Sequence, residues 1–251
     1  MITQFVELDE QLGSKGRYFN PFGPPMFHFK LNQQVFNLVY DCVRDFQKHD
    51  EFKTGHIIQG TNAEENEHNS IVNGEIFGIP PKWQFENHNG ILANCVKEVT
   101  HQYACLCARA SKDDIALREY DHIGEKVEED IHAFVPEIET IWYVSLKEGD
   151  FHIIHDHASN STFSGAIYLQ TPEAPYPQGK INWIVSGNGG GMYNNVYGIV
   201  PIAGDVFIWP SWISHTVYPF RGDGERLMIS FNSRVKVKNG VLPTMDDIND
   251  K

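Results

Sequence analysis

Residues 138–157 read IETIWYVSLKEGDFHIIHDH, and the character of the chain changes where this stretch begins. From about residue 138 onward, short β-prone runs follow one another, and segments rich in turn-forming residues separate them. The later runs are FSGAIYLQ, KINWIV, DVFIWP, HTVYPF and RLMISFNSRV. Many short strands with turn signals between them predict a mainly β fold, either a sandwich or a closed jelly roll.

Two amphipathic helices are predicted upstream of this β-rich region. The first spans residues 31–48 and the second spans about 91–110, and each carries its apolar residues on one stripe. The first stripe contains Val35, Val39, Cys42, Val43 and Phe46, and the second contains Leu92, Cys95, Val96, Val99, Tyr103 and Leu106. A lone helix of this length is marginal in water, so both stripes must be covered by other parts of the protein.

The rest of the N-terminal half carries weaker signals. We expect one strand within residues 1–30, a polar loop region over 51–90 and a weaker, charged helical segment over 113–134. Residues 1–137 are therefore predicted to be a strand-and-helix scaffold packed on a barrel formed by residues 138–241. The whole is expected to be a single compact domain, which suits a chain of 251 residues.

Composition excludes several classes of function. The formal net charge of −13 argues against a long basic groove for nucleic acid. No stretch approaches the roughly 18 apolar residues of a membrane span, and the N-terminal MITQFVELDEQLGSKG lacks a signal-peptide pattern. We therefore expect a cytoplasmic protein, with its four cysteines as reduced thiols.

The histidine pair in HDH at residues 155–157 is the central chemical feature. Side chains at positions i and i+2 of a strand point to the same face, so His155 and His157 converge while Asp156 points away. Neutral imidazole is a good ligand for iron, zinc, copper or nickel. His215 follows the apolar run DVFIWPSWIS and is the candidate third ligand. Three ligands on one face leave positions open for substrate and oxygen.

Two alternatives apply to these histidines. The chain has 12 histidines, so a chance HxH is plausible, and His152 on the same run is expected to be an incidental neighbour. Asp156 would replace His157 as a ligand only if a bulge turned it inward.

Arg226 supplies a second chemical signal. It lies eleven residues after His215 and begins the strand RLMISFN. A buried arginine needs an anionic partner, and its planar fork matches a carboxylate with two hydrogen bonds. A 2-oxo dicarboxylate could chelate a metal with one end and meet Arg226 with the other. The alternative partner is a nearby acid, Asp223 or Glu225.

From Trp142 to Asn232 the chain resembles the 2-oxoglutarate and Fe(II)-dependent oxygenases, most closely an uncharacterised branch with an HxH…H…R pattern. The resemblance is carried by an ordered series of motifs. They are Trp142, His155-Asp156-His157, Ser164-Gly165 through Tyr168-Leu169, Gly204-Asp205 through Pro210-Ser211-Trp212 to His215, and Arg226 through Ser230-Phe231-Asn232. The order and spacing of the series are far more specific than any one piece.

This resemblance implies a double-stranded β-helix, which is a jelly-roll or cupin-like barrel, flanked by helices. It implies Fe(II) bound by His155, His157 and His215, with 2-oxoglutarate as cosubstrate and O2 as oxidant. Arg226 is implied as the clamp for 2-oxoglutarate, and Tyr168 is a further candidate contact. The implied activity is hydroxylation of an unidentified small molecule or peptidyl residue, with release of succinate and CO2.

Two positions depart from the wider superfamily. That superfamily usually carries HxD or HxE, whereas this chain has His157 at the acid position, so three neutral ligands would change metal preference and redox tuning. Met228 stands where some members carry a serine that also holds the cosubstrate.

Two rival functions stay open at this stage. One is a cupin-like metal enzyme that does not use 2-oxoglutarate, and the other is a non-catalytic ligand-binding jelly roll. The Gly-rich loop at residues 186–195 is read as a flexible lid or as a plain long turn, since it lacks the Lys-Ser/Thr of a phosphate-binding loop. The substrate and the oligomeric state are not readable from the sequence.

Overall fold

The computed structural model describes residues 3–7, 12, 15–19, 26–49, 72–73, 75–113, 134–158, 161–185, 195–237 and 240–241. The charged segment predicted as helical over 113–134 falls almost wholly outside these ranges, as do nearly all of the 186–195 loop and the acidic part of 51–90.

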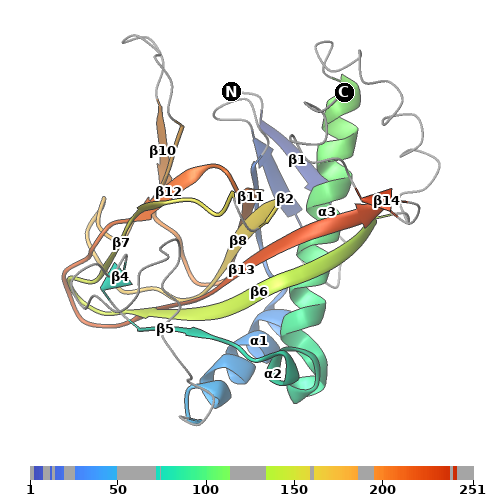
Figure 1. Cartoon of the computed structure of the whole chain (residues 1–251). Helices are drawn as coiled ribbons and strands as arrows, with labels where there is room; N and C mark the ends of the chain where they lie inside the picture. The colour runs from blue at the N-terminus through green and yellow to red at the C-terminus, as the bar shows by residue number, and fades with distance from the viewer. Residues whose placement is uncertain are drawn as a thin grey trace, which may run out of the picture.

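The strands form two antiparallel sheets (Figure 1). The nine-stranded sheet contains, in spatial order, β1 (Thr3–Glu7), β2 (Lys15–Phe19), β3 (Met26–Lys30), β11 (Asp205–Pro210), β8 (Phe163–Gln170), β13 (Arg226–Val237), β6 (Phe134–Leu146) and β5 (Glu75–Gly78), and β14 (Gly240–Val241) pairs with β13. The five-stranded sheet contains β10 (Val196–Ile199), β9 (Ile181–Ile184), β12 (Ser214–Val217), β7 (Phe151–His155) and β4 (Val72–Asn73). No ladder joins the two sheets among the residues that the structure describes, so the jelly roll is not closed by hydrogen bonds.

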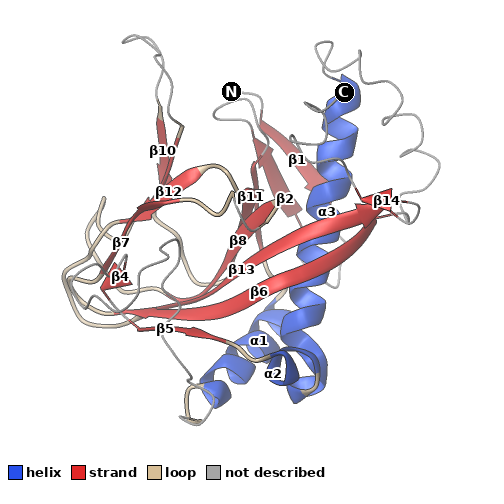
Figure 2. Ribbon diagram, viewed as in Figure 1, coloured by secondary structure: helices blue, strands red, loops and turns tan. Residues whose placement is uncertain are grey.

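Helices cover one face of the nine-stranded sheet, as Figure 2 shows for the long helix beside β6 and β13. They are α1 (Gln33–Phe46), α2 (Pro81–Phe85), the 3-10 helix η2 (Asn87–Gly90) and α3 (Ile91–Asp113). Helix α1 begins where the Asn32 side chain accepts a hydrogen bond from the Gln34 amide. The predicted stripes of both long helices face the sheet, and all of their residues are buried except Val35, which is partly buried.

Two apolar clusters lie on the two faces of the large sheet. The first cluster joins helix residues such as Val39 and Val96 to Ile167, Ile229 and Phe231 of the sheet. The second lies between the sheets and joins Trp142 and Tyr168 of the large sheet to Trp183 and Val217 of the small one. Strands such as β8 and β11 are buried on both faces, which explains their nearly continuous apolar sequences.

The N-terminal region contributes more strands than we predicted. Residues 1–30 contain three strands rather than one, and β3 pairs with β11 inside the large sheet. Residues 72–90 contain β4, β5, α2 and η2, although we read the whole of 51–90 as loop. All of these elements are five residues long or shorter, so their apolar periodicity is too brief to recognise.

Two further details differ from the predictions. The edge strand β10 was missed because VYGI is short and contains a glycine, and it pairs only with β9. The proposed boundary at residue 138 falls inside β6, which begins at Phe134. Within the described residues, no helix combines the length and apolar character needed to cross a bilayer.

Candidate metal centre

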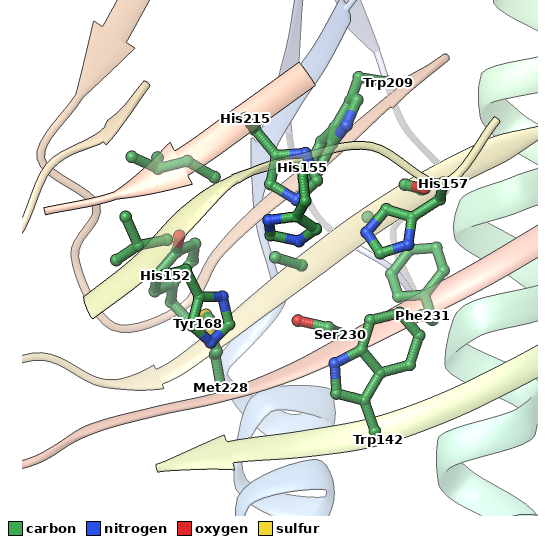
Figure 3. Close-up of a pocket in the computed structure, with 15 residues that line it drawn as sticks. Trp142, His152, His155, His157, Tyr168, Trp209, His215, Met228, Ser230 and Phe231 are labelled. Atoms are coloured by element: carbon green, nitrogen blue, oxygen red, sulfur yellow. The ribbon is translucent and has the colours of Figure 1, made fainter. Parts of the chain in front are cut away.

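Three histidines converge in the space between the two sheets (Figure 3). His155 ends β7, His157 follows it by two residues, and His215 lies on the neighbouring strand β12, where it pairs directly with His155. One nitrogen from each ring lies within 4.8 Å of the others. A first-row metal lies about 2.1 Å from each nitrogen, so the three side chains would have to move closer together to bind one ion.

The backbone around β7 decides which side chains enter the cavity. His155 and His157 point inward, as the i, i+2 spacing predicts, whereas the Asp156 carboxylate points away and accepts a hydrogen bond from the Ala158 amide. The question whether Asp156 or His157 joins the group is therefore answered in favour of His157. A register shift between β7 and β12 also turns His152, three residues before His155, into the same cavity.

Each of the three rings has its Nδ1 atom directed at a polar neighbour. His155 Nδ1 lies 2.8 Å from the Ile153 carbonyl, and His215 Nδ1 lies 3.4 Å from the Ile213 carbonyl. A carbonyl can only accept, so these two rings carry their proton on Nδ1 and leave the Nε2 lone pair free.

The third ring is oriented by the side chain of Asn232 on β13. His157 Nδ1 lies 3.4 Å from the Asn232 amide, which in turn contacts the Ser164 hydroxyl at 2.9 Å. The amide oxygen and nitrogen can exchange places by half a turn, so Asn232 can accept the Nδ1 proton of His157 while its nitrogen faces Ser164. Partners of this kind orient the histidine ligands of metal sites.

Burial keeps these imidazoles neutral. Desolvation is the main cause that lowers the pKa of His157 to about 3, with His155 as a smaller cause. The pKa of His155 is lowered, and that of His215 is lowered well below its usual value, again mainly by burial. Neutral imidazole is the form that binds a metal, so the group is ready to act as a ligand set at neutral pH.

Aromatic side chains form the walls of the cavity. Trp209 stands edge-on to the His215 ring at a centroid distance of 5.1 Å, and Trp142 lies 5.7 Å from the His157 ring. Both tryptophans are buried and line the cavity, whereas Trp212 is half exposed at 50%. The motif residue Gly165 lies against Phe231, where an added Cβ would stand 2.2 Å from the ring, so only glycine fits there.

Arg226 is buried at the start of β13, with only 1% of its surface exposed. Its Nε and Nη1 atoms are buried and have no hydrogen-bond partner. The alternative partner Glu225 instead binds Arg44 at 3.1 Å and the Ser145 hydroxyl at 2.7 Å. Among the residues that the structure describes, no acid pairs with the Arg226 guanidinium, which acts electrostatically on the cavity residues His152 and Tyr168. Burial lowers the pKa of Arg226.

Tyr168 lines the cavity together with the histidines and interacts electrostatically with Arg226. It pairs across the sheet with Met228, and both side chains line the cavity. Its hydroxyl is buried without a hydrogen-bond partner, and burial raises the pKa of Tyr168 to about 12, so the group stays protonated as a donor. Met228, the position that departs from the superfamily, fills apolar space here and offers no hydrogen bond.

The sequence did not predict the roles of His152 and Asn232 in this site. His152 was expected to be incidental, but it is 6% exposed and lines the cavity. Asn232 was noted only as part of a motif, and its contact with His157 was not foreseen. His152 turns inward because of the register shift in β7, and Asn232 reaches His157 because β13 passes behind it. Both are tertiary features, and the SFN motif was the one signal for them in the sequence.

Comparison with known proteins supports the family resemblance. Residues 140–232 match the family model described as "Putative 2OG-Fe(II) oxygenase". The match starts before the first histidine of the triad and ends on Asn232, and it confirms the resemblance for that segment. Enzymes of this family use Fe(II), 2-oxoglutarate and O2, the three components that the family's name states. No curated protein matches the sequence significantly.

Solved structures with similar folds include oxygenases of this type. A Trichoplax adhaerens prolyl hydroxylase, in complex with a hypoxia-inducible-factor peptide fragment, has 15% identity and a TM-score of 0.51 over 83% of this chain and 82% of its own. A Pseudomonas putida prolyl-4-hydroxylase has 15% identity and a TM-score of 0.45 over 82% of this chain and 91% of its own.

A Burkholderia pseudomallei oxidoreductase of the 2OG-Fe(II) oxygenase family has 16% identity and a TM-score of 0.33, over 47% of this chain and 52% of its own. The matched part of this chain thus spans about half of that protein's length. At these identities a likeness concerns the fold alone, and the Trichoplax structure, with its TM-score of 0.51, confirms the predicted double-stranded β-helix flanked by helices.

Proposed function

We propose that this protein is an Fe(II)- and 2-oxoglutarate-dependent dioxygenase that hydroxylates a C–H bond of a small molecule or a peptidyl residue. One observation carries the proposal: a buried arginine without an anionic partner lies beside the cavity that holds three converging, neutral histidines. A metal site and a carboxylate site next to one another are what a chelating 2-oxo dicarboxylate requires.

The residues present fit both groups. His155, His157 and His215 would hold Fe(II) through the nitrogens that their Nδ1 contacts leave free. The unpartnered Arg226 and Tyr168 donors would hold the distal carboxylate of 2-oxoglutarate. A buried charge of this kind is costly until an anion reaches it, so the cosubstrate would satisfy groups that the protein leaves unsatisfied.

When bound, Fe(II), 2-oxoglutarate and O2 supply the oxidation: the 2-oxo acid is decarboxylated to succinate and CO2, and one oxygen atom of O2 enters the substrate as a hydroxyl group. The chain's own residues prepare this chemistry. The three histidines would hold the metal, and three protein ligands would leave further coordination positions for the cosubstrate and O2. Arg226 and Tyr168 orient the five-carbon acid along the cavity, while Trp142 and Trp209 keep water from the histidines.

The test is anaerobic loading with Fe(II), followed by addition of 2-oxoglutarate and O2 and measurement of succinate. We expect slow succinate formation without substrate, and faster formation with a true substrate, whose mass rises by one oxygen atom. Candidate substrates should include peptides and small metabolites. The net charge of −13 gives no support to a nucleic-acid substrate.

The same experiment separates the rival functions. Metal binding without 2-oxoglutarate binding would favour the cupin-like enzyme, for which three neutral histidines are also a suitable ligand set. Absence of metal binding would favour a ligand-binding jelly roll without catalysis.

A further inference from the structure

A fourth histidine enters the cavity beside the triad. His152 is 6% exposed, and its Nε2 atom is buried without a hydrogen-bond partner in the part of the chain that the structure describes. Figure 3 shows its ring below His155, beside Tyr168 and Met228. The His152 ring lies 5.7 Å from the His155 ring, and it is outside the group of nitrogens that lie within 4.8 Å of one another. The proposed metal position does not account for it.

The strand registers place His152 between the triad and Arg226. On β12 its partner Val217 lies two residues beyond His215, a step of about 6.6 Å along a strand. On the opposite sheet Tyr168 pairs with Met228, which is two residues from Arg226 on the same strand. The residues that act electrostatically on His152 include His155, which belongs to the triad, and Arg226. His152 and Tyr168 thus occupy the same level of the cavity, from opposite sheets.

The unpartnered polar atoms at this level are all able to donate. They are His152 Nε2, Tyr168 Oη, and Nε and Nη1 of Arg226. Guanidinium groups only donate, a neutral imidazole donates from one ring nitrogen, and a phenol donates its proton. Buried donors without acceptors indicate a ligand that brings several acceptor oxygens. A carboxylate is such a ligand, with two oxygens and about four lone-pair positions.

We propose that His152 is a third anchor for the distal carboxylate of 2-oxoglutarate and donates its Nε2–H to one carboxylate oxygen while Arg226 and Tyr168 hold the other positions. This inference rests on the proposed function, since it concerns the same cosubstrate. His152 would contact the carboxylate from the small sheet, whereas Arg226 and Tyr168 would contact it from the large sheet. The acid would therefore be held from both sides. Met228 leaves the serine contact of some relatives unfilled, and His152 supplies a donor in its place.

The experiment compares wild type, His152→Gln and His152→Phe, each loaded anaerobically with Fe(II). Glutamine can present a donor close to the position of Nε2, whereas phenylalanine keeps the ring volume and removes the donor. Each protein is titrated with 2-oxoglutarate and with 2-oxopentanoate, a five-carbon 2-oxo acid that lacks the distal carboxylate. Binding is followed by calorimetry and by the fluorescence of the cavity tryptophans. Metal content is measured in parallel, and His88→Asn, a change at a surface histidine, is the control.

We expect His152→Phe to weaken 2-oxoglutarate binding about tenfold or more, as loss of a hydrogen bond to a charged group does. His152→Gln should recover most of that affinity. Binding of 2-oxopentanoate and metal content should change less than about twofold in both variants.

Several results would overturn the inference. An unchanged 2-oxoglutarate affinity in His152→Phe would show that His152 makes no contact. An equal loss for both acids would show that it serves the metal end or the packing, and a loss of metal would make it a ligand. In all of these cases wild type still binds 2-oxoglutarate, and the proposed function stands. Failure of metal-loaded wild type to bind 2-oxoglutarate would overturn the proposed function and this inference together.

Discussion

The two faces of strand β13 differ in role: one packs in the apolar core, and the other contributes to the candidate site. Leu227 and Ile229 face the helices and are fully buried in an apolar cluster, and Phe231 belongs to that cluster and also lines the cavity. Of the alternate positions, Met228 and Ser230 line the cavity, and Arg226 and Asn232 on either side of them are polar and buried. The apolar side chains of the first face are covered by the helices, whereas Nε and Nη1 of Arg226 have no hydrogen-bond partner among the residues that the structure describes.

The difference teaches where to look for function in this fold. An apolar strand face indicates only that another part of the protein packs on it. A buried donor without an acceptor destabilises the folded protein by about 1–3 kcal/mol. Such a donor therefore indicates a ligand that supplies the acceptor. The following predictions test this division, beginning with the largest expected effect.

Removal of residues 1–137 should abolish cooperative folding. The truncation deletes β3 from the large sheet together with α1 and α3, and it exposes Ile229 and Phe231. A chain beginning at Ile138 should be insoluble or molten, without a sharp thermal transition or dispersed NMR signals. A soluble, cooperatively folded fragment would show instead that the β-region is an independent domain.

Replacement of His155 or His157 by alanine should reduce bound metal from one ion per chain to nearly none. Each change leaves two imidazoles, which are too few to hold an ion in competition with water. Elemental analysis of purified protein measures the effect, with His88→Asn as a matched surface control. Equal metal content in wild type and both alanine variants would refute the metal centre.

Arg226→Ala should weaken 2-oxoglutarate binding about a hundredfold, a loss on the order of 3 kcal/mol. Arg226→Lys should recover only part, because lysine keeps the charge and loses the two-pronged geometry. Metal content should hardly change. Calorimetric titration of the metal-loaded proteins measures the effect.

Two controls on the same strand sharpen this test. Arg234→Ala removes an exposed arginine that pairs with Glu137, and Ile229→Val alters the apolar face. Ile229→Val should cost about 1 kcal/mol of stability, yet both controls should bind 2-oxoglutarate like wild type. Unchanged binding in Arg226→Ala would favour the cupin-like enzyme.

Asn232→Val should weaken metal binding about tenfold, because His157 loses the group that orients its ring. Asn232→Asp keeps an acceptor for the Nδ1 proton and should restore most of the affinity. Competition with a chromogenic chelator measures both variants. If valine and aspartate lower the affinity equally, Asn232 serves packing rather than ligand orientation.

Much of the fold and of the candidate site was predictable from local patterns. The stripes of α1 and α3 have the helical period, so their buried residues could be named in advance. The HDH spacing was enough to direct His155 and His157 to one side of a strand. The ordered motifs from Trp142 to Asn232 were enough to indicate the oxygenase resemblance, which the family match over residues 140–232 confirms.

The sequence by itself therefore determined what depends on spacing along the chain: the two helix faces, the direction of the histidine pair and the series of motifs. Only the tertiary structure decided what depends on neighbours. It pairs His215 with His155, turns His152 inward through a register shift, and leaves Arg226 unpaired by directing Glu225 to Arg44. The reason is physical, because periodicity fixes the direction of a side chain, whereas its partners come from strands that are distant in the sequence and meet only when the sheets form.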